Sequence, residues 1–215
     1  TYTIYETRPV ITRNARFKHL GEEQITLTSA MSASVDLPDY DYEMIELTGA
    51  WSRERYVKNR KLEHGIQAVY SMRGASSSNY NPFLALKRPH TTEFDGEVYG
   101  FSLVYSGNFL AQAEVHTYGT TRVMMGLHPN RFNWVLSQGE EFQTPEVVMV
   151  YSENGLNGMS QTYHELYRTR LCRGYWRDRV RPILVNNWEA TYFDFNEDKI
   201  VSIAKDAKDL GIELF

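Results

Sequence analysis

Short apolar runs separated by turn residues fill the chain from Thr3 to about Val150. The runs are rich in β-branched and aromatic residues and alternate partly with polar ones, which predicts strands rather than helices. Glycine, asparagine, aspartate and proline lie between them, and Ser106-Gly-Asn108 is typical of a hairpin turn. Many short strands at this spacing favour an antiparallel sandwich. The predicted strands are Val10–Phe17, Gln24–Val35, Glu43–Leu47, Ile66–Tyr70, Tyr99–Ser106, Phe109–Thr117, Thr120–Leu127 and Val147–Tyr151.

The hydrophobic pattern changes to a helical period near residue 155. Apolar residues recur at helical spacing over Gly158–Cys172, and a second helix is expected between Asn196 as N-cap and Gly211 as the glycine after its end. Apolar runs at Ile183–Val185 and Ile212–Phe215 flank this second helix and predict a strand–helix–strand unit. Two strands cannot close a barrel, so we expect further chain after Phe215 unless a partner covers the exposed edge.

The composition excludes several classes of protein. The chain has 215 residues and a net charge of −4, without a basic run suited to nucleic acid. The longest apolar stretch is too short for a membrane span. Cys172 is the only cysteine, so we expect no internal disulfide, a small buried side chain at that position and a cytoplasmic location. The six histidines are scattered, and we expect neither a metal site nor a cofactor.

The candidate binding residues lie directly after the apolar run that begins at residue 183. Asn186, Asn187, Trp188 and Glu189 follow it directly. Active sites of α/β barrels form at the carboxyl ends of the strands, so these side chains are candidates for a binding site. Trp188 would stack on a sugar or plug the top of a barrel. The two asparagines and Glu189 would contact sugar hydroxyls or, as we favour, support neighbouring loops.

Several segments resemble glycoside hydrolase family 36, the bacterial-type α-galactosidases. They are spread in order over residues 45 to 215. The segments are Gly49-Ala-Trp-Ser-Arg-Glu-Arg55, Arg73-Gly-Ala-Ser-Ser-Ser-Asn-Tyr-Asn-Pro82, Gly126-Leu-His-Pro129, Phe132-Asn-Trp-Val-Leu136, Gly139-Glu-Glu-Phe-Gln-Thr-Pro-Glu146, Tyr151-Ser-Glu-Asn-Gly-Leu156, Arg181-Pro-Ile-Leu-Val-Asn-Asn-Trp-Glu189 and Leu210-Gly-Ile-Glu-Leu-Phe215.

The resemblance implies a mainly β fold: an antiparallel β-supersandwich, a linker helix and the first β-α-β unit of an incomplete (β/α)8 barrel. We expect a partial sandwich domain at 1–154, a linker at 155–180 and the start of the barrel at 181–215. The resemblance also implies a homo-oligomer, commonly a tetramer, in which a neighbour's sandwich borders the active site.

The resemblance further implies hydrolysis of terminal α-linked galactose from melibiose- or raffinose-type oligosaccharides with retention. The catalytic aspartates would lie on strands after Phe215, so no catalytic residue is assigned in this chain. Glu140 and Glu141 do not replace them, because neighbouring residues on a strand point to opposite faces. Trp188 matches an active-site tryptophan of the family. Trp51 either helps to line the sugar site or packs at a domain interface with an arginine.

Two other functions remain open from the sequence. The chain could act as a non-catalytic module that binds carbohydrate or mediates assembly. It could also belong to a relative with different specificity, such as an α-N-acetylgalactosaminidase or a galactosyl transferase. The pocket residues that separate these enzymes would lie beyond Phe215.

Overall fold

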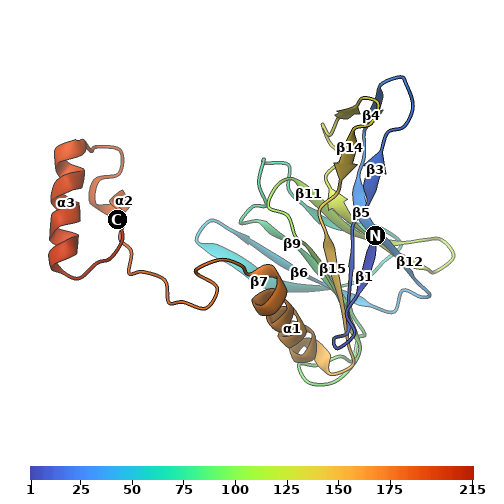
Figure 1. The fold of residues 1–215 in the computed structure, drawn as a ribbon. Helices are drawn as coiled ribbons and strands as arrows, with labels where there is room; N and C mark the ends of the chain where they lie inside the picture. The colour runs from blue at the N-terminus through green and yellow to red at the C-terminus, as the bar shows by residue number, and fades with distance from the viewer. The chain divides into compact units, whose positions relative to one another are not determined.

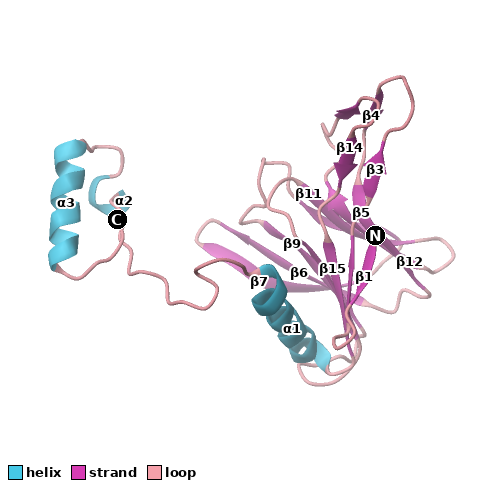
Figure 2. Cartoon of the chain, in the orientation of Figure 1, coloured by secondary structure: helices cyan, strands magenta, loops and turns pink.

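The computed structural model describes residues 1–215, which form two compact units. The first unit spans Thr1–Glu165 and the second spans Leu166–Phe215. Strands make up most of the first unit, whereas the second contains short helices and loops (Figure 2).

The first unit is built on a seven-stranded antiparallel sheet in the order β1-β2-β15-β10-β9-β6-β7 (Figure 1). Its central strands bury neighbouring residues, such as Leu84, Ala85 and Leu86, in keeping with a sheet covered on both faces. Its strands are β1 (Tyr2–Ile4), β2 (Val10–Arg13), β6 (Glu43–Ala50), β7 (Arg53–Lys61), β9 (Tyr80–Lys87), β10 (Val98–Leu103) and β15 (Val147–Ser152).

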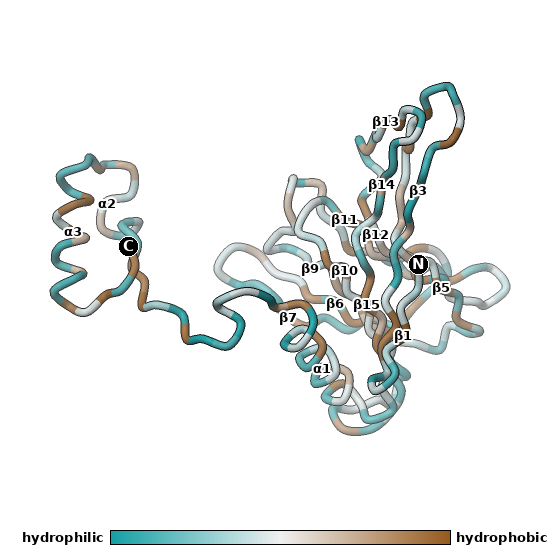
Figure 3. Tube along the Cα trace, viewed as in Figure 1, coloured by the Kyte–Doolittle hydropathy of each residue, from teal (hydrophilic) through white to brown (hydrophobic).

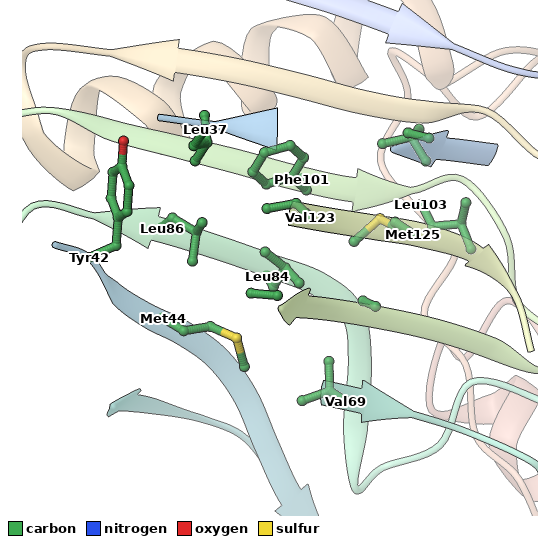
Figure 4. Close-up of a cluster of buried hydrophobic side chains, with 14 of the residues drawn as sticks. Leu37, Tyr42, Met44, Val69, Leu84, Leu86, Phe101, Leu103, Val123 and Met125 are labelled. Carbon is green, nitrogen blue, oxygen red and sulfur yellow. The ribbon is translucent and has the colours of Figure 1, made fainter. Parts of the chain in front are cut away.

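A three-stranded sheet in the order β11-β12-β5 covers part of one face of the larger sheet. It consists of β5 (Met31–Leu37), β11 (Phe109–Val115) and β12 (Thr121–Leu127), and β8 (Gly65–Tyr70) lies beside β11. Every second residue of β11 is buried, as the alternation of the sequence predicts. Between the sheets, Met44, Leu84 and Phe101 meet Val123 and Met125 in one apolar cluster (Figure 4).

Two short strand ladders project from these sheets. β3 (Arg16–Lys18) pairs with β14 (Glu141–Gln143), and β4 (Ile25–Leu27) pairs with β13 (Trp134–Leu136). Phe142 packs against Phe132 and Trp134, with ring centroids 5.6 Å and 5.0 Å apart. The outer end of the ladders is mostly hydrophilic, in contrast to the hydrophobic course of β15 (Figure 3).

Helix α1 (Gly155–Leu166) packs on the opposite face of the seven-stranded sheet. Met159 and Tyr163 are buried, and the Tyr163 hydroxyl donates a hydrogen bond to the Val148 carbonyl at 3.1 Å. The helix approaches closely because Gly100 on β10 has no side chain. The residues after α1, Tyr167–Leu171, form a π-helical turn, η1.

The second unit contains the predicted second helix, whereas the strands predicted at 183–185 and 212–215 are reduced to a single bridge. α3 (Glu197–Asp209) begins after Asn196, whose side chain accepts a hydrogen bond from the Lys199 amide at 3.0 Å. It is followed by Gly211 at φ +81°. The apolar segments on either side meet at one parallel bridge, Leu184 with Leu214.

The predicted mainly β, antiparallel fold is confirmed, but several element boundaries were wrong. The run Gln24–Val35 is two strands, β4 and β5, and Val10–Phe17 is also divided into β2 and β3. The helix expected over Gly158–Cys172 begins three residues earlier and ends as an α-helix at Leu166. Cys172 is exposed rather than buried. The strands β1, β7, β9, β13 and β14 were not predicted. The proposed domain boundaries at 154 and 180 stay predictions.

Candidate functional site

Trp188 lies in the second unit, at the start of the short helix α2 (Trp188–Thr191). The sequence placed Trp188 at the end of a strand, but pairing stops at Leu184 and Val185, and a turn precedes the tryptophan. Asn186 holds this turn, because its side-chain oxygen accepts a hydrogen bond from the Trp188 amide at 2.8 Å. The backbone position of the indole is therefore set by a neighbouring side chain.

Asn187 also stabilises the turn. Its side-chain amide donates to the Thr191 hydroxyl at 2.8 Å, and that hydroxyl donates back to the Asn187 carbonyl at 3.0 Å. Glu189, in the first turn of α2, is exposed. Within this unit, the Asn186 side chain thus bonds the backbone and the Asn187 side chain bonds the Thr191 hydroxyl, while the supporting role that the sequence favours stays a prediction.

Two aromatic side chains that were not singled out from the sequence pack around Trp188. The ring of Tyr192 lies 5.4 Å from it and the ring of Phe193 lies 5.0 Å from it, both in edge-to-face geometry. Trp188 itself remains 45% exposed. The sequence could have indicated this aromatic cluster, because the run Ala-Thr-Tyr-Phe after Glu189 places both rings within five residues of the indole. A half-exposed indole fixed in this way can stack on the apolar face of a sugar.

Trp51 lies in the first unit, at the tip of the hairpin between β6 and β7. It is 86% exposed, and Ser52 beside it has a left-handed backbone at φ +62°. The cation–π contacts of the chain lie elsewhere, so neither Arg53 nor Arg55 covers the ring. The tip therefore presents a large, uncovered aromatic surface.

Gly49 allows the two strands of this hairpin to come together. A Cβ at this position would overlap the Arg53 carbonyl oxygen and lie 2.7 Å from the Glu54 Cα. The pairing register shifts between Thr48 and Ala50, as expected for a bulge. The glycine of the Gly49-Ala-Trp motif is thus required by the close approach of β7.

The Arg73–Pro82 segment is a loop as far as Asn79 and enters β9 at Tyr80. The Gly74 amide donates to the Asn108 side-chain oxygen at 2.7 Å, and the Ser76 amide donates to the Ser106 carbonyl at 2.7 Å. The loop is therefore tied to the predicted hairpin turn at residues 106–108.

Several carboxyl groups of the first unit with a lowered pKa belong to structural networks. Arg88 bonds both carboxylate oxygens of Asp39, at 2.7 Å and 3.2 Å, contacts Glu97 at 3.0 Å and stacks on Tyr42. The hydrogen bonds to Arg88 hold the pKa of Asp39 below its usual range, and burial raises the pKa of Tyr42 to about 12. These carboxylates are neutralised by a cation and are poorly suited to general acid–base chemistry.

The adjacent acidic residues Glu140 and Glu141 serve separate structural contacts. Glu141 pairs with Arg16, whose hydrogen bond holds the pKa of the carboxyl below its usual range. Glu140 accepts a hydrogen bond from the Ser137 amide at 2.7 Å. No group of three or more His, Cys, Asp or Glu side chains in residues 1–215 is arranged to hold a metal ion.

Comparison with known families decides what this chain is related to. Residues 1–137 match the model of the glycosyl hydrolase family 36 N-terminal domain, and residues 141–215 match the melibiase model. The chain belongs to glycosyl hydrolase family 36. This agrees with the resemblance found in the sequence motifs.

Curated relatives align with almost the whole chain. It is 64% identical over 213 residues to α-galactosidase AgaA of Geobacillus stearothermophilus and 49% identical over 214 residues to Mel36A of Lactobacillus acidophilus. The alignments cover 99% and 100% of this chain, but only 29% of each relative. The chain thus spans less than a third of the length of these family members.

Solved structures of relatives confirm the fold. The chain superposes on AgaB of Geobacillus stearothermophilus with a TM-score of 0.89 at 64% identity, covering 100% of this chain and 30% of that one. Variants of AgaA in complex with stachyose and with raffinose superpose with TM-scores of 0.88 and 0.89, again at 64% identity and over 99% of this chain and 30% of theirs. In the present chain, none of the helices has the length and apolar character required to cross a bilayer.

Proposed function

We propose that this chain is part of an α-galactosidase that releases terminal α-linked galactose from oligosaccharides of the raffinose type. The observation that carries the proposal is the match to family 36 over both halves of the chain, together with relatives described as α-galactosidases and solved with raffinose or stachyose. The reaction needs two carboxylates flanking the glycosidic bond, about 5–5.5 Å apart for retention. We assign these to aspartates outside this chain.

In this proposal, Trp188 and Trp51 contribute to substrate binding. The half-exposed indole of Trp188 would stack on the apolar face of galactose, while Asn186, Asn187 and Glu189 support the turn or contact hydroxyls. Trp51 would contact the sugar from an exposed hairpin tip. The longer protein would carry a complete (β/α)8 barrel and a β-supersandwich, assemble as a homotetramer and be cytoplasmic.

An assay with a nitrophenyl α-galactoside tests the proposed activity. We expect turnover by the longer protein and none by residues 1–215 alone, because this chain lacks the catalytic carboxylates. Turnover by residues 1–215, or its absence in the intact protein on any α-galactoside, would contradict the proposal. Parallel assays with α-N-acetylgalactosaminides and with galactosyl transfer to an acceptor sugar separate the two related specificities.

A Trp188→Ala change in the longer protein tests the binding role. Loss of a stacked aromatic ring should raise KM for raffinose by about tenfold, since sugar stacking on an indole is of the order of 1 kcal/mol or more. Trp188→Phe is the matched control, because it keeps an aromatic ring at this position and should change KM much less. If Trp188→Ala left the kinetics unchanged, the tryptophan would be structural only.

A further inference from the structure

A hollow of about 320 Å³ lies on the seven-stranded sheet, behind the tip of the β6–β7 hairpin. Three adjacent strands form its floor, because Thr48 on β6 is paired with Tyr56 on β7 and with Tyr80 on β9. The hollow has the volume of a small ligand site. Its remaining polar walls are Arg53, Lys58 and Asn79.

The side chains around this hollow are rich in hydrogen-bond donors. Arg53 and Lys58 are positively charged, and the two tyrosines carry hydroxyl groups. The Asn79 side-chain oxygen already accepts a hydrogen bond from Arg73 at 2.5 Å, which leaves the NH2 group of this amide as the group available to a ligand. No carboxylate lines the hollow. A donor-rich hollow with two cations is complementary to an anion.

The positive charge of β7 also favours an anion as the ligand. The strand Arg-Glu-Arg-Tyr-Val-Lys-Asn-Arg-Lys carries five basic residues and one acidic residue, in a chain whose net charge is −4. Glu46 lies opposite Lys58 in the ladder, but its carboxylate is engaged by Arg60. Neither Arg53 nor Lys58 is among the ion pairs of the chain. Their charge is therefore not neutralised locally.

The wall formed by Tyr80 is held in place from behind. Its ring stacks on Tyr70, with centroids 6.3 Å apart and planes 26° apart, and Tyr70 in turn contacts the His128 ring at 5.4 Å. On the other side of the hollow, the Gly49 amide donates to the Asn79 carbonyl at 2.9 Å. The Tyr80 ring and the Asn79 backbone are thus held in place before any ligand binds, which lowers the entropic cost of ordering this part of the hollow.

We propose that this hollow binds an oxyanion, either free phosphate or the phosphate or carboxylate group of an acidic sugar. Arg53 and Lys58 bind the charged oxygens, and the Asn79 amide and the tyrosine hydroxyls donate to the remaining acceptors. Occupancy of the hollow is measured without turnover, so a failure of this proposal can be distinguished from a failure of the proposed galactosidase activity.

Titration of residues 1–215 at low ionic strength tests the proposal, with inorganic phosphate as the first probe and binding followed by calorimetry and amide NMR. We expect saturable binding that weakens as salt is added. Lys58→Gln and Arg53→Gln should each weaken phosphate binding by about tenfold, since each removes a charge-assisted hydrogen bond. Absence of saturable binding overturns the proposal.

Lys61→Gln is the matched control. Lys61 lies on the same exposed strand and carries the same charge, but it does not line the hollow. Its replacement should change phosphate affinity by less than about twofold. An effect as large as that of Lys58→Gln would show that β7 attracts anions without a site, and would refute the proposal. Circular dichroism of all three variants checks that the fold is retained.

Further probes separate the two sources of the oxyanion. Galactose 6-phosphate and galacturonate binding more tightly than inorganic phosphate would support an acidic sugar as the ligand. Equal affinity of all three would assign the site to the oxyanion alone. Neutral galactose should not bind here, and a galactose affinity equal to that of phosphate would contradict the proposal.

Discussion

Replacing Gly100 by alanine should separate helix α1 from the seven-stranded sheet. An added Cβ would lie 2.7 Å from the Met159 sulfur and 2.8 Å and 2.9 Å from Cε2 and the hydroxyl oxygen of Tyr163. Ordinary contacts between such atoms are about 3.5–4.0 Å, so each side chain must move by about 1 Å. Because the sheet lies behind the glycine, the movement has to come from the helix.

The expected loss in the free energy of unfolding has two contributions. Overpacking of a well-filled contact costs about 1–3 kcal/mol. The moved Tyr163 hydroxyl also loses its 3.1 Å hydrogen bond to the Val148 carbonyl, which contributes about 1 kcal/mol. We therefore expect Gly100→Ala to lower the free energy of unfolding by about 2–4 kcal/mol, or the Tm by about 4–16 °C for a unit of this size.

Urea denaturation of residues 1–215, followed by circular dichroism, measures this loss. A double-mutant cycle with Met159→Ala supplies the control, because the shorter side chain makes room for the new methyl group. In the Met159→Ala background, Gly100→Ala should cost at least about 1 kcal/mol less than in the original chain. A cost below about 0.5 kcal/mol, or the same cost in both backgrounds, would refute the packing argument.

Two further predictions concern charge and backbone in the first unit. Since hydrogen bonds to Arg88 hold the folded-state pKa of Asp39 below its ordinary value, the stability from this pair is present above about pH 4 and lost as the pH falls through the folded pKa. Arg88→Gln should flatten this acid limb of stability in urea titrations between pH 6 and pH 2, and an unchanged slope would contradict the assignment. Gly49→Ala should distort the β6–β7 hairpin, because the new Cβ overlaps the Arg53 carbonyl and lies 2.7 Å from the Glu54 Cα. We expect the amide resonances of this hairpin to shift while those of β11 and β12 stay in place, and an unaltered hairpin spectrum would argue against a need for glycine.

The sequence predicted those strands in which alternate residues are buried in the core and the residues between them are more exposed. In β11, Phe109, Ala111 and Ala113 face the core while the residues between them are half-buried, so the period of two is visible without any knowledge of the neighbours. The same holds for β12, where alternate residues from Thr121 to Leu127 are buried. Local sequence therefore carried enough information for β11 and β12 and the residues that they bury, whereas β5 was merged with β4 in one predicted strand.

The edge strand β7 could not be found in this way. All nine of its residues are exposed and most are polar, so neither hydrophobicity nor alternation marks it. It is a strand because β6 pairs with it from Glu43–Lys61 to Ala50–Arg53. The ladders β3–β14 and β4–β13 were missed for a related reason, since each joins segments more than one hundred residues apart in the chain. Long-range pairing of this kind leaves little trace in a window of a few residues.

The candidate binding residues also differ in whether their partners are near or distant in the sequence. Asn186 and Asn187 shape the turn before Trp188 through contacts within four residues. The run of two asparagines beside a tryptophan was therefore sufficient to locate this turn in the sequence. The proposed oxyanion site combines β7 with Asn79 and Tyr80, which lie more than twenty residues further along the chain. Because Thr48 brings those strands together, the donor-rich character of the hollow follows from the sheet register and not from any single motif. The sequence of β7 alone indicates only a basic strand. Its pairing with β6 places Arg53 and Lys58 in one hollow with Asn79 and Tyr80.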